Sequence, residues 1–302
     1  MRVVPVVLVI ALWPRVAAAQ GRELGLSLDR PVKNLTVSGQ LRLPPDGEPA
    51  RCVLVLVNWP MSRGVFESPR WRESLDSLGC AMLLATFDAP TDQDLPPERQ
   101  PVRNAAVGGA ESLAILLERF AVRVRHPELR AVPLLFWGFS ASGSFGTTFA
   151  GLHPERTIAV VRFQSHTRTI PVDHQRIREI PHLLIAGGED ETAGTDDAQR
   201  LWIAGRRAGA PWTFVIQSGT AHGEGLAEAT DLMLSWIAGA VRQRTGGRGG
   251  LTEIDSGSTW YGHLRTLTTA PGLPDPSQEL ESSWLPDERT ARLWRALMEV
   301  KP

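Results

Sequence analysis

The feature that most restricts the fold of this chain is a serine placed directly after a short apolar run. Residues 132–136 read VPLLF, which predicts a buried strand, and residues 137–143 continue as WGFSASG. Gly138 and Ser142, two positions before and after Ser140, are small enough for a sharp turn from strand into helix. Such a turn presents a hydroxyl as a nucleophile, and amides at the start of the helix can bind an oxyanion. The alternative is an ordinary Ser/Gly-rich loop.

Two further predicted strands end in residue types that would activate a serine. Residues 180–186 read IPHLLIA, and an acidic turn, GGEDET, follows. Residues 212–216 read WTFVI and lead into QSGTAHG, which places His222 on a loop before a helix predicted from Leu226 to about Val241. Histidine can take a proton from serine and return it near neutral pH, and a carboxylate can orient the imidazole ring. The three groups therefore occur in the order serine, acid, histidine, each after a strand.

These three motifs resemble those of the α/β-hydrolase family, over most of residues 36–242. The chain looks most like the secreted esterase and depolymerase branches, such as polyhydroxyalkanoate depolymerases, feruloyl or acetylxylan esterases and cutinase-like polyesterases. Ser142 departs from the family's G-x-S-x-G pattern. The superfamily resemblance does not depend on that position, but the choice of a subfamily does, so no branch is assigned.

The resemblance implies a role for each group of the triad. Ser140 would be the nucleophile, His222 the general base and acid, and Asp190 the orienting carboxylate. Glu189 and Glu191 are neighbouring rivals, and Asp190 is preferred because the family spaces its acid three residues after a glycine, here Gly187. The alternative is that all three acids are solvated turn charges.

The second oxyanion donor is expected after an earlier strand. Residues 51–58, RCVLVLVN, form the strongest apolar run after the N-terminal segment and predict a buried parallel strand, which WPMSRG follows. Pro60 has no N–H to donate. The amide of Ala141 is therefore expected to act with that of Met61 or, less favoured, Trp59. Trp59 could also line the acyl pocket, or it could simply pack on the strand ends.

Strands that alternate with helices predict an α/β fold with a mostly parallel central sheet and helices on both faces. We expect residues 20–244 to form one α/β-hydrolase catalytic domain. Only residues 164–180 lie between the strand after the nucleophile helix and the strand before the acid, which is too short for a large cap domain. This favours an open cleft. His166, at the end of its strand, is either a substrate contact or a surface polar group.

The C-terminal part begins with a flexible break, TGGRGG, at residues 245–250. We expect residues 245–302 to form an extension that packs on the core. Within it, Asp287 can cap a helix from about Glu288 to Val300. The alternative is a small carbohydrate-binding appendage that uses the aromatic side chains, but residues 251–302, which are 52 residues without a disulfide, make a poor independent module.

The N-terminus predicts a targeting segment. Residues 3–13 form an apolar stretch too short to span a bilayer, and an alanine triplet at 17–19 offers a cleavage site. We therefore expect residues 1–19 to be a signal peptide and the mature protein to be exported to the periplasm or beyond. A retained membrane anchor is the alternative. Cys52 and Cys80 open two strands that are neighbours in the family, so they are either bridged or free and buried.

Composition narrows the possible partners. The net charge of −1 gives no electrostatic reason to expect nucleic acid. No ligand spacing is present among the histidines, so no metal or cofactor is expected. The combined expectation is a secreted serine hydrolase that cleaves small or polymeric carboxylic esters through an acyl-enzyme, without a membrane partner after signal cleavage. A peptidase or amidase of the same fold and an inactive binding protein remain alternatives. The sequence leaves the oligomeric state open.

Overall fold

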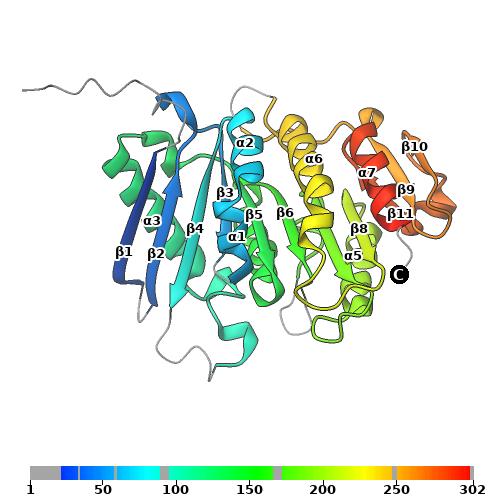
Figure 1. Ribbon diagram of the computed structural model, residues 1–302, viewed down its shortest axis with the longest axis horizontal. Helices are drawn as coiled ribbons and strands as arrows, with labels where there is room; N and C mark the ends of the chain where they lie inside the picture. Colours follow the sequence, from blue (N-terminus) through cyan, green and yellow to red (C-terminus); the bar gives the residue numbers. More distant parts are fainter. Residues whose placement is uncertain are drawn as a thin grey trace, which may run out of the picture.

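The described residues of the computed structural model (22–32, 35–57, 60–88, 95–165, 172–246 and 250–299) are built around one large mixed sheet (Figure 1). Its strands lie in the order β1-β2-β4-β3-β5-β6-β7-β8. They are β1 (Glu23–Val32), β2 (Leu35–Arg42), β3 (Cys52–Val57), β4 (Cys80–Asp88), β5 (Leu134–Phe139), β6 (Thr157–Phe163), β7 (His182–Gly187) and β8 (Trp212–Gln217). Strand β2 is antiparallel to both of its neighbours, β1 and β4. Strands β4, β3, β5, β6, β7 and β8 run parallel to one another.

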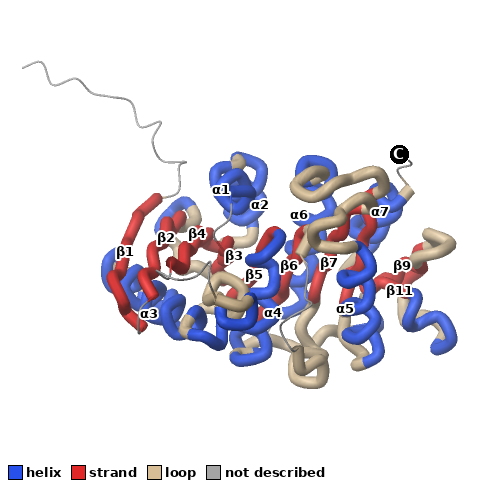
Figure 2. The backbone as a smooth tube through the Cα atoms, turned by 90° about the horizontal axis from the view of Figure 1, so that it is seen from below, coloured by secondary structure: helices blue, strands red, loops and turns tan. Residues whose placement is uncertain are grey.

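Helices cover both faces of this sheet, as Figure 2 shows. The helices are α1 (Pro60–Glu67), α2 (Pro69–Ser77), α3 (Gly109–Val124), α4 (Gly143–Leu152), α5 (Thr195–Arg207), α6 (Leu226–Arg244) and α7 (Glu288–Met298). One core cluster includes side chains of α3, α4 and α5, and the other includes side chains of α1, α2, α6 and α7. Strands buried on both faces need continuous apolar runs, and every residue of β3 and β5 is buried. The predicted fold class is therefore confirmed.

Two local predictions need correction. The amphipathic pattern of residues 105–124 predicts a single helix, but this segment is broken at Gly108, whose φ of 103° lies in the left-handed region and separates a short 3₁₀ turn from α3. The sequence WPMSRG at residues 59–64 also predicts a loop after the apolar strand, but helix α1 begins at Pro60, a residue suited to the first helical turn. Ser62 Oγ donates to the Val57 carbonyl at 2.6 Å and holds the start of α1 against the end of β3.

The C-terminal segment packs along β8, the last strand of the sheet. It contributes a small sheet of β9 (Trp260–His263), β10 (Thr269–Pro271) and β11 (Ser282–Leu285), followed by α7. Ser283 Oγ accepts from the Phe214 amide at 2.9 Å, and Trp294 Nε1 donates to the Phe214 carbonyl at 2.8 Å. Asp287 caps α7, as the sequence predicts, by accepting from the Thr290 amide at 2.8 Å. Side chains thus satisfy backbone groups that an edge strand would otherwise leave open for aggregation.

The two cysteines are bridged. Cys52 and Cys80 are register partners on the parallel strands β3 and β4, with their Cα atoms 4.6 Å apart, and they form a disulfide. Both are fully buried. Of the two alternatives that the sequence left open, the structure therefore supports the bridge. Among the described residues, no helix is long and apolar enough to cross a membrane.

A buried histidine should make stability depend on pH. His182 begins β7, is fully buried, and bonds the Ile180 carbonyl through Nδ1 at 2.9 Å. Burial lowers the pKa of His182 to about 3 from its ordinary 6.5, and the nearby charges of Arg162 and His174 act in the same direction. In the unfolded chain His182 therefore binds a proton below about pH 6.5, whereas in the folded chain it does so only below about pH 3. The free energy of unfolding therefore falls as the pH falls from about 6.5 to about 3.

We expect this group to contribute a loss of about 2 to 3 kcal/mol in the free energy of unfolding between pH 7 and pH 4.5. Urea unfolding at both pH values should show the loss in the natural protein. A His182→Leu variant has no imidazole at this position to titrate. Its free energy of unfolding should therefore fall by about 2 to 3 kcal/mol less than that of the natural protein between the two pH values. Equal pH dependence in the two proteins would contradict this assignment.

Candidate active site

Ser140 sits at the apex of a strained turn between a strand and a helix. It directly follows β5 and begins a 3₁₀ turn, Ser140–Ser142, that leads into α4. Its φ is 51°, in the left-handed region that non-glycine residues rarely adopt. Such strain persists only where the surrounding structure imposes it, and it is typical of functional sites.

The glycines beside Ser140 explain how this turn closes. A Cβ on Gly138 would lie 2.5 Å from the Ser142 carbonyl oxygen, and one on Gly143 would lie 2.4 Å from Ser165 Cβ. The second close approach therefore falls on Gly143, one position later than in G-x-S-x-G. Ser142 is tolerated because its hydroxyl donates to the Phe139 carbonyl at 2.9 Å.

The structure brings Ser140, His222 and Asp190 together at the carboxyl ends of three parallel strands, β5, β8 and β7. His222 Nε2 lies 3.0 Å from Ser140 Oγ. On the other side of the ring, His222 Nδ1 lies 2.8 Å from Asp190 Oδ2. A carboxylate can only accept, so Nδ1 carries the ring proton and Nε2 is left to accept from the serine hydroxyl. This arrangement can remove a proton from Ser140.

Asp190 is held more firmly than its acidic neighbours. It is only 4% exposed, and its second oxygen, Oδ1, accepts from the amides of Thr192 at 3.0 Å and Ala193 at 2.8 Å. One oxygen therefore anchors the turn while the other contacts His222. Glu189 and Glu191 are exposed, and no hydrogen bond joins either of them to His222.

His222 packs on an aromatic ring. Its imidazole is stacked on Phe139, with ring centroids 4.8 Å apart and an interplanar angle of 29°. Phe139 is the last residue of β5, directly before the serine. The stacking limits rotation of the imidazole, while the remaining exposed part of the ring, 21% of the side chain, stays open to solvent.

Several solved structures of other proteins are similar to this chain. Matches include a dienelactone hydrolase from Anabaena variabilis, 20% identical over 72% of this chain and 98% of that chain, with a TM-score of 0.51. A ferulic acid esterase is 16% identical, covering 67% and 92% of the two chains, with a TM-score of 0.49. Est1E from Butyrivibrio proteoclasticus is 12% identical, covering 72% and 98%, with a TM-score of 0.47.

This chain has the α/β-hydrolase fold. The likeness to the dienelactone hydrolase, which extends over nearly all of that protein, carries this statement. No family model and no curated protein sequence matches the chain.

Of the four other predicted site residues in this α/β-hydrolase fold, the structure describes two. Ala141 is buried in the turn directly after Ser140. Met61 is the second residue of α1, where helical amides have no carbonyl partner within the helix. Trp59 and His166 lie outside the described residues, so their predicted contacts with substrate remain predictions.

One polar residue near the triad was not singled out from the sequence. Gln164 follows β6 directly, and its side chain bonds backbone groups of the loop that carries His222. A glutamine after a strand carries no signal in a single sequence. Only the position of the strand end, beside that of β5, could have pointed to it.

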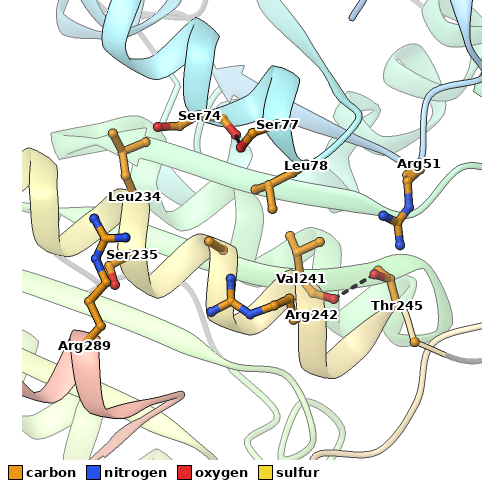
Figure 3. Close-up of a pocket in the computed structure, with 12 residues that line it drawn as sticks. Arg51, Ser74, Ser77, Leu78, Leu234, Ser235, Val241, Arg242, Thr245 and Arg289 are labelled. Atoms are coloured by element: carbon orange, nitrogen blue, oxygen red, sulfur yellow. Dashed lines mark hydrogen bonds between the residues drawn. The ribbon is translucent and has the colours of Figure 1, made fainter.

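A cavity of about 540 Å³ lies elsewhere, between α2, α6 and α7. Figure 3 shows Arg51, Arg242 and Arg289 around it, together with serine hydroxyls. Neither Ser140 nor His222 lines this cavity, and its arginines are exposed. It is therefore separate from the arrangement of Ser140, His222 and Asp190. Within the described residues, no group of three or more acids, histidines and cysteines could hold a metal ion.

Proposed function

We propose that this protein is a serine esterase that hydrolyses carboxylic esters through an acyl-enzyme. The observation that carries the proposal is the hydrogen-bonded series from Ser140 Oγ through His222 to Asp190, built on a strained strand-to-helix turn. A serine hydroxyl needs a positioned base, and that base needs an orienting partner. The hydrogen bonds of His222 to Ser140 and Asp190 support these two roles.

The reaction follows from these contacts. His222 Nε2 takes the hydroxyl proton as Ser140 Oγ attacks the ester carbonyl carbon, and Asp190 stabilises the resulting imidazolium. The amides of Ala141 and Met61 are proposed to bind the negatively charged oxygen. The imidazolium then gives its proton to the departing alcohol, leaving an ester on Ser140. Water, deprotonated by His222, attacks this ester and releases the acid, and the proton returns to Ser140.

One feature favours esters as the substrate class, and a second favours open access to the site. The structure named dienelactone hydrolase has the same fold, and a lactone is a cyclic ester. In addition, only residues 164–181 connect β6 to β7, which leaves no room for a large cap domain. This short connection supports access for bulky or polymeric esters, with Trp59 and His166 proposed as substrate contacts.

We also propose that the protein works outside the cytoplasm. Residues 1–19 have the pattern of a signal peptide, although they lie outside the described residues. The buried Cys52–Cys80 disulfide supports export, because such bonds persist in oxidising compartments.

The proposal is tested with the purified protein on p-nitrophenyl acetate, butyrate and octanoate and on p-nitroanilide counterparts. A fluorophosphonate probe and peptide mapping by mass spectrometry then locate the reactive residue. Ester turnover with the probe on Ser140 is expected. Faster anilide than ester turnover would instead indicate an amidase. No turnover and no labelling would overturn the proposal and favour a binding protein.

A further inference from the structure

We propose that Gln164 is a positioning residue that holds the His222 loop in register with Ser140. The inference rests on the proposed function, because the position that Gln164 maintains matters only if His222 transfers a proton. Within the described residues, the hydrogen bonds of the Gln164 side chain go to the backbone of the His222 loop and not to Ser140 or Asp190.

Gln164 and Ser140 occupy equivalent places on neighbouring strands. Phe139 of β5 is paired in register with Phe163 of β6, so the next residue on each strand lies at the same edge of the sheet. Like Ser140, Gln164 has a left-handed φ, here 46°. Its amide donates to the Ile185 carbonyl of β7 at 2.7 Å, which fixes the backbone of Gln164 to the sheet.

The Gln164 side chain bonds the loop on both sides of His222. Nε2 donates to the carbonyls of Ala221 at 3.1 Å and Glu224 at 3.0 Å, and Oε1 accepts from the Gly223 amide at 2.6 Å. Carbonyl oxygens only accept and an amide N–H only donates, so the orientation of the glutamine amide is determined by its partners. Both of its N–H donors are used.

The Gln164 side chain is enclosed by the structure around it. Gln164 is 1% exposed, whereas residues 220–225 are partly or fully exposed. A Cβ on Gly187 would lie 3.2 Å from Gln164 Nε2, so a larger residue at that position would crowd the amide. A solvent-facing loop is thus tied to the rigid sheet by a buried amide.

Loss of the Gln164 contacts should affect proton transfer by His222 more than substrate binding. A displacement of about 1 Å in a catalytic group can lower a rate on the order of 100-fold. The imidazole lies 3.0 Å from Ser140 Oγ, a distance that depends on where this loop is held. Loosening the loop should therefore lower kcat and leave KM nearly unchanged for a small ester, since Gln164 is buried beneath the loop.

Two substitutions separate the side chain from the backbone. Gln164→Asn keeps the amide group and tolerates a left-handed φ, but it is one methylene shorter and cannot reach all three partners. Gln164→Glu has nearly the same shape, but its carboxylate cannot donate to two carbonyls. The matched control is Gln243→Asn, because Gln243 lies in the last turn of α6, outside the loop that carries His222, and its amide likewise donates to a backbone carbonyl, that of Pro286, at 2.9 Å.

The measurements are kcat and KM for p-nitrophenyl butyrate, thermal unfolding, and hydrogen exchange of the peptide that covers residues 218–226. We expect kcat to fall about 10- to 100-fold in both Gln164 variants, with KM within about threefold of the natural value. Exchange at Gly223 should be faster in both variants. The Gln243→Asn control should match the natural protein in kcat, KM and exchange.

Several outcomes would overturn the inference. Unchanged kcat in both folded variants would do so, whether or not exchange at Gly223 rises. A rise in KM with constant kcat would instead make Gln164 a determinant of binding. A natural protein with neither turnover nor fluorophosphonate labelling would overturn the proposed function, and this role with it. An active natural protein beside unaffected variants would overturn the role alone.

Discussion

Replacing Ser140 with alanine is expected to lower kcat for p-nitrophenyl butyrate by about 10⁵- to 10⁶-fold. The hydroxyl is the only group that could form the acyl-enzyme in the proposed mechanism, and its partner His222 lies 3.0 Å away. Without it, His222 and Asp190 have no nucleophile to activate. The activity that remains should come from binding and the oxyanion donors alone.

Steady-state assays and fluorophosphonate labelling check this expectation. In Ser140→Ala, turnover should fall to this residual level and labelling should disappear. Ser235→Ala serves as the matched control, because Ser235 is a buried serine on α6 whose hydroxyl bonds Thr290 Oγ1 at 3.0 Å. It should retain natural turnover. If Ser140→Ala kept more than a few per cent of the natural kcat, a different nucleophile would have to be sought.

Asp190→Asn is expected to lower kcat by about 10⁴-fold while the fold stays intact. The amide that replaces Oδ2 would donate toward His222 Nδ1 and favour the tautomer with its proton on Nε2, which cannot accept from Ser140. The oxygen that replaces Oδ1 can still accept from the amides of Thr192 and Ala193. The turn should therefore keep its shape, so the loss is chemical.

Its controls are the two neighbouring acids. Glu189→Gln and Glu191→Gln change the same chemical group in the same turn, but both residues are exposed. Each should keep kcat within about twofold, because exposed charges contribute little at this range in salt. A loss in Glu191→Gln as large as that in Asp190→Asn would show that the carboxylate has been misassigned. Thermal unfolding of all three variants should differ little.

Much of the fold could be predicted because buried parallel strands need continuous apolar runs. Residues 51–58 and 132–136 read as strands from their side chains alone, and in the structure β3 lies within the first segment while β5 begins within the second. Helix α5 and the small sheet of β9, β10 and β11 were not predicted. Their apolar residues are few and interrupted, and they become ordered by packing against β8 and its neighbours.

The candidate site was partly predictable for a related reason. Ser140, Asp190 and His222 each follow a strand, and parallel strands bring their carboxyl ends to one edge of the sheet. Gln164 was not predictable, because its partners are backbone groups 57 to 60 residues away. Backbone acceptors look alike in any sequence, so only three-dimensional proximity identifies them.

Hydrophobicity and side-chain chemistry belong to each residue, so the order of amino acids alone identifies the segments that are apolar enough to be buried and the residue types that could carry acyl transfer. How these groups meet depends on the folded arrangement of the strands. Strand register placed Cys52 beside Cys80, and the turn after β7 directed Asp190, rather than Glu189 or Glu191, toward His222. Such contacts depend on the geometry of strands that are distant in sequence, and packing of the whole sheet determines that geometry.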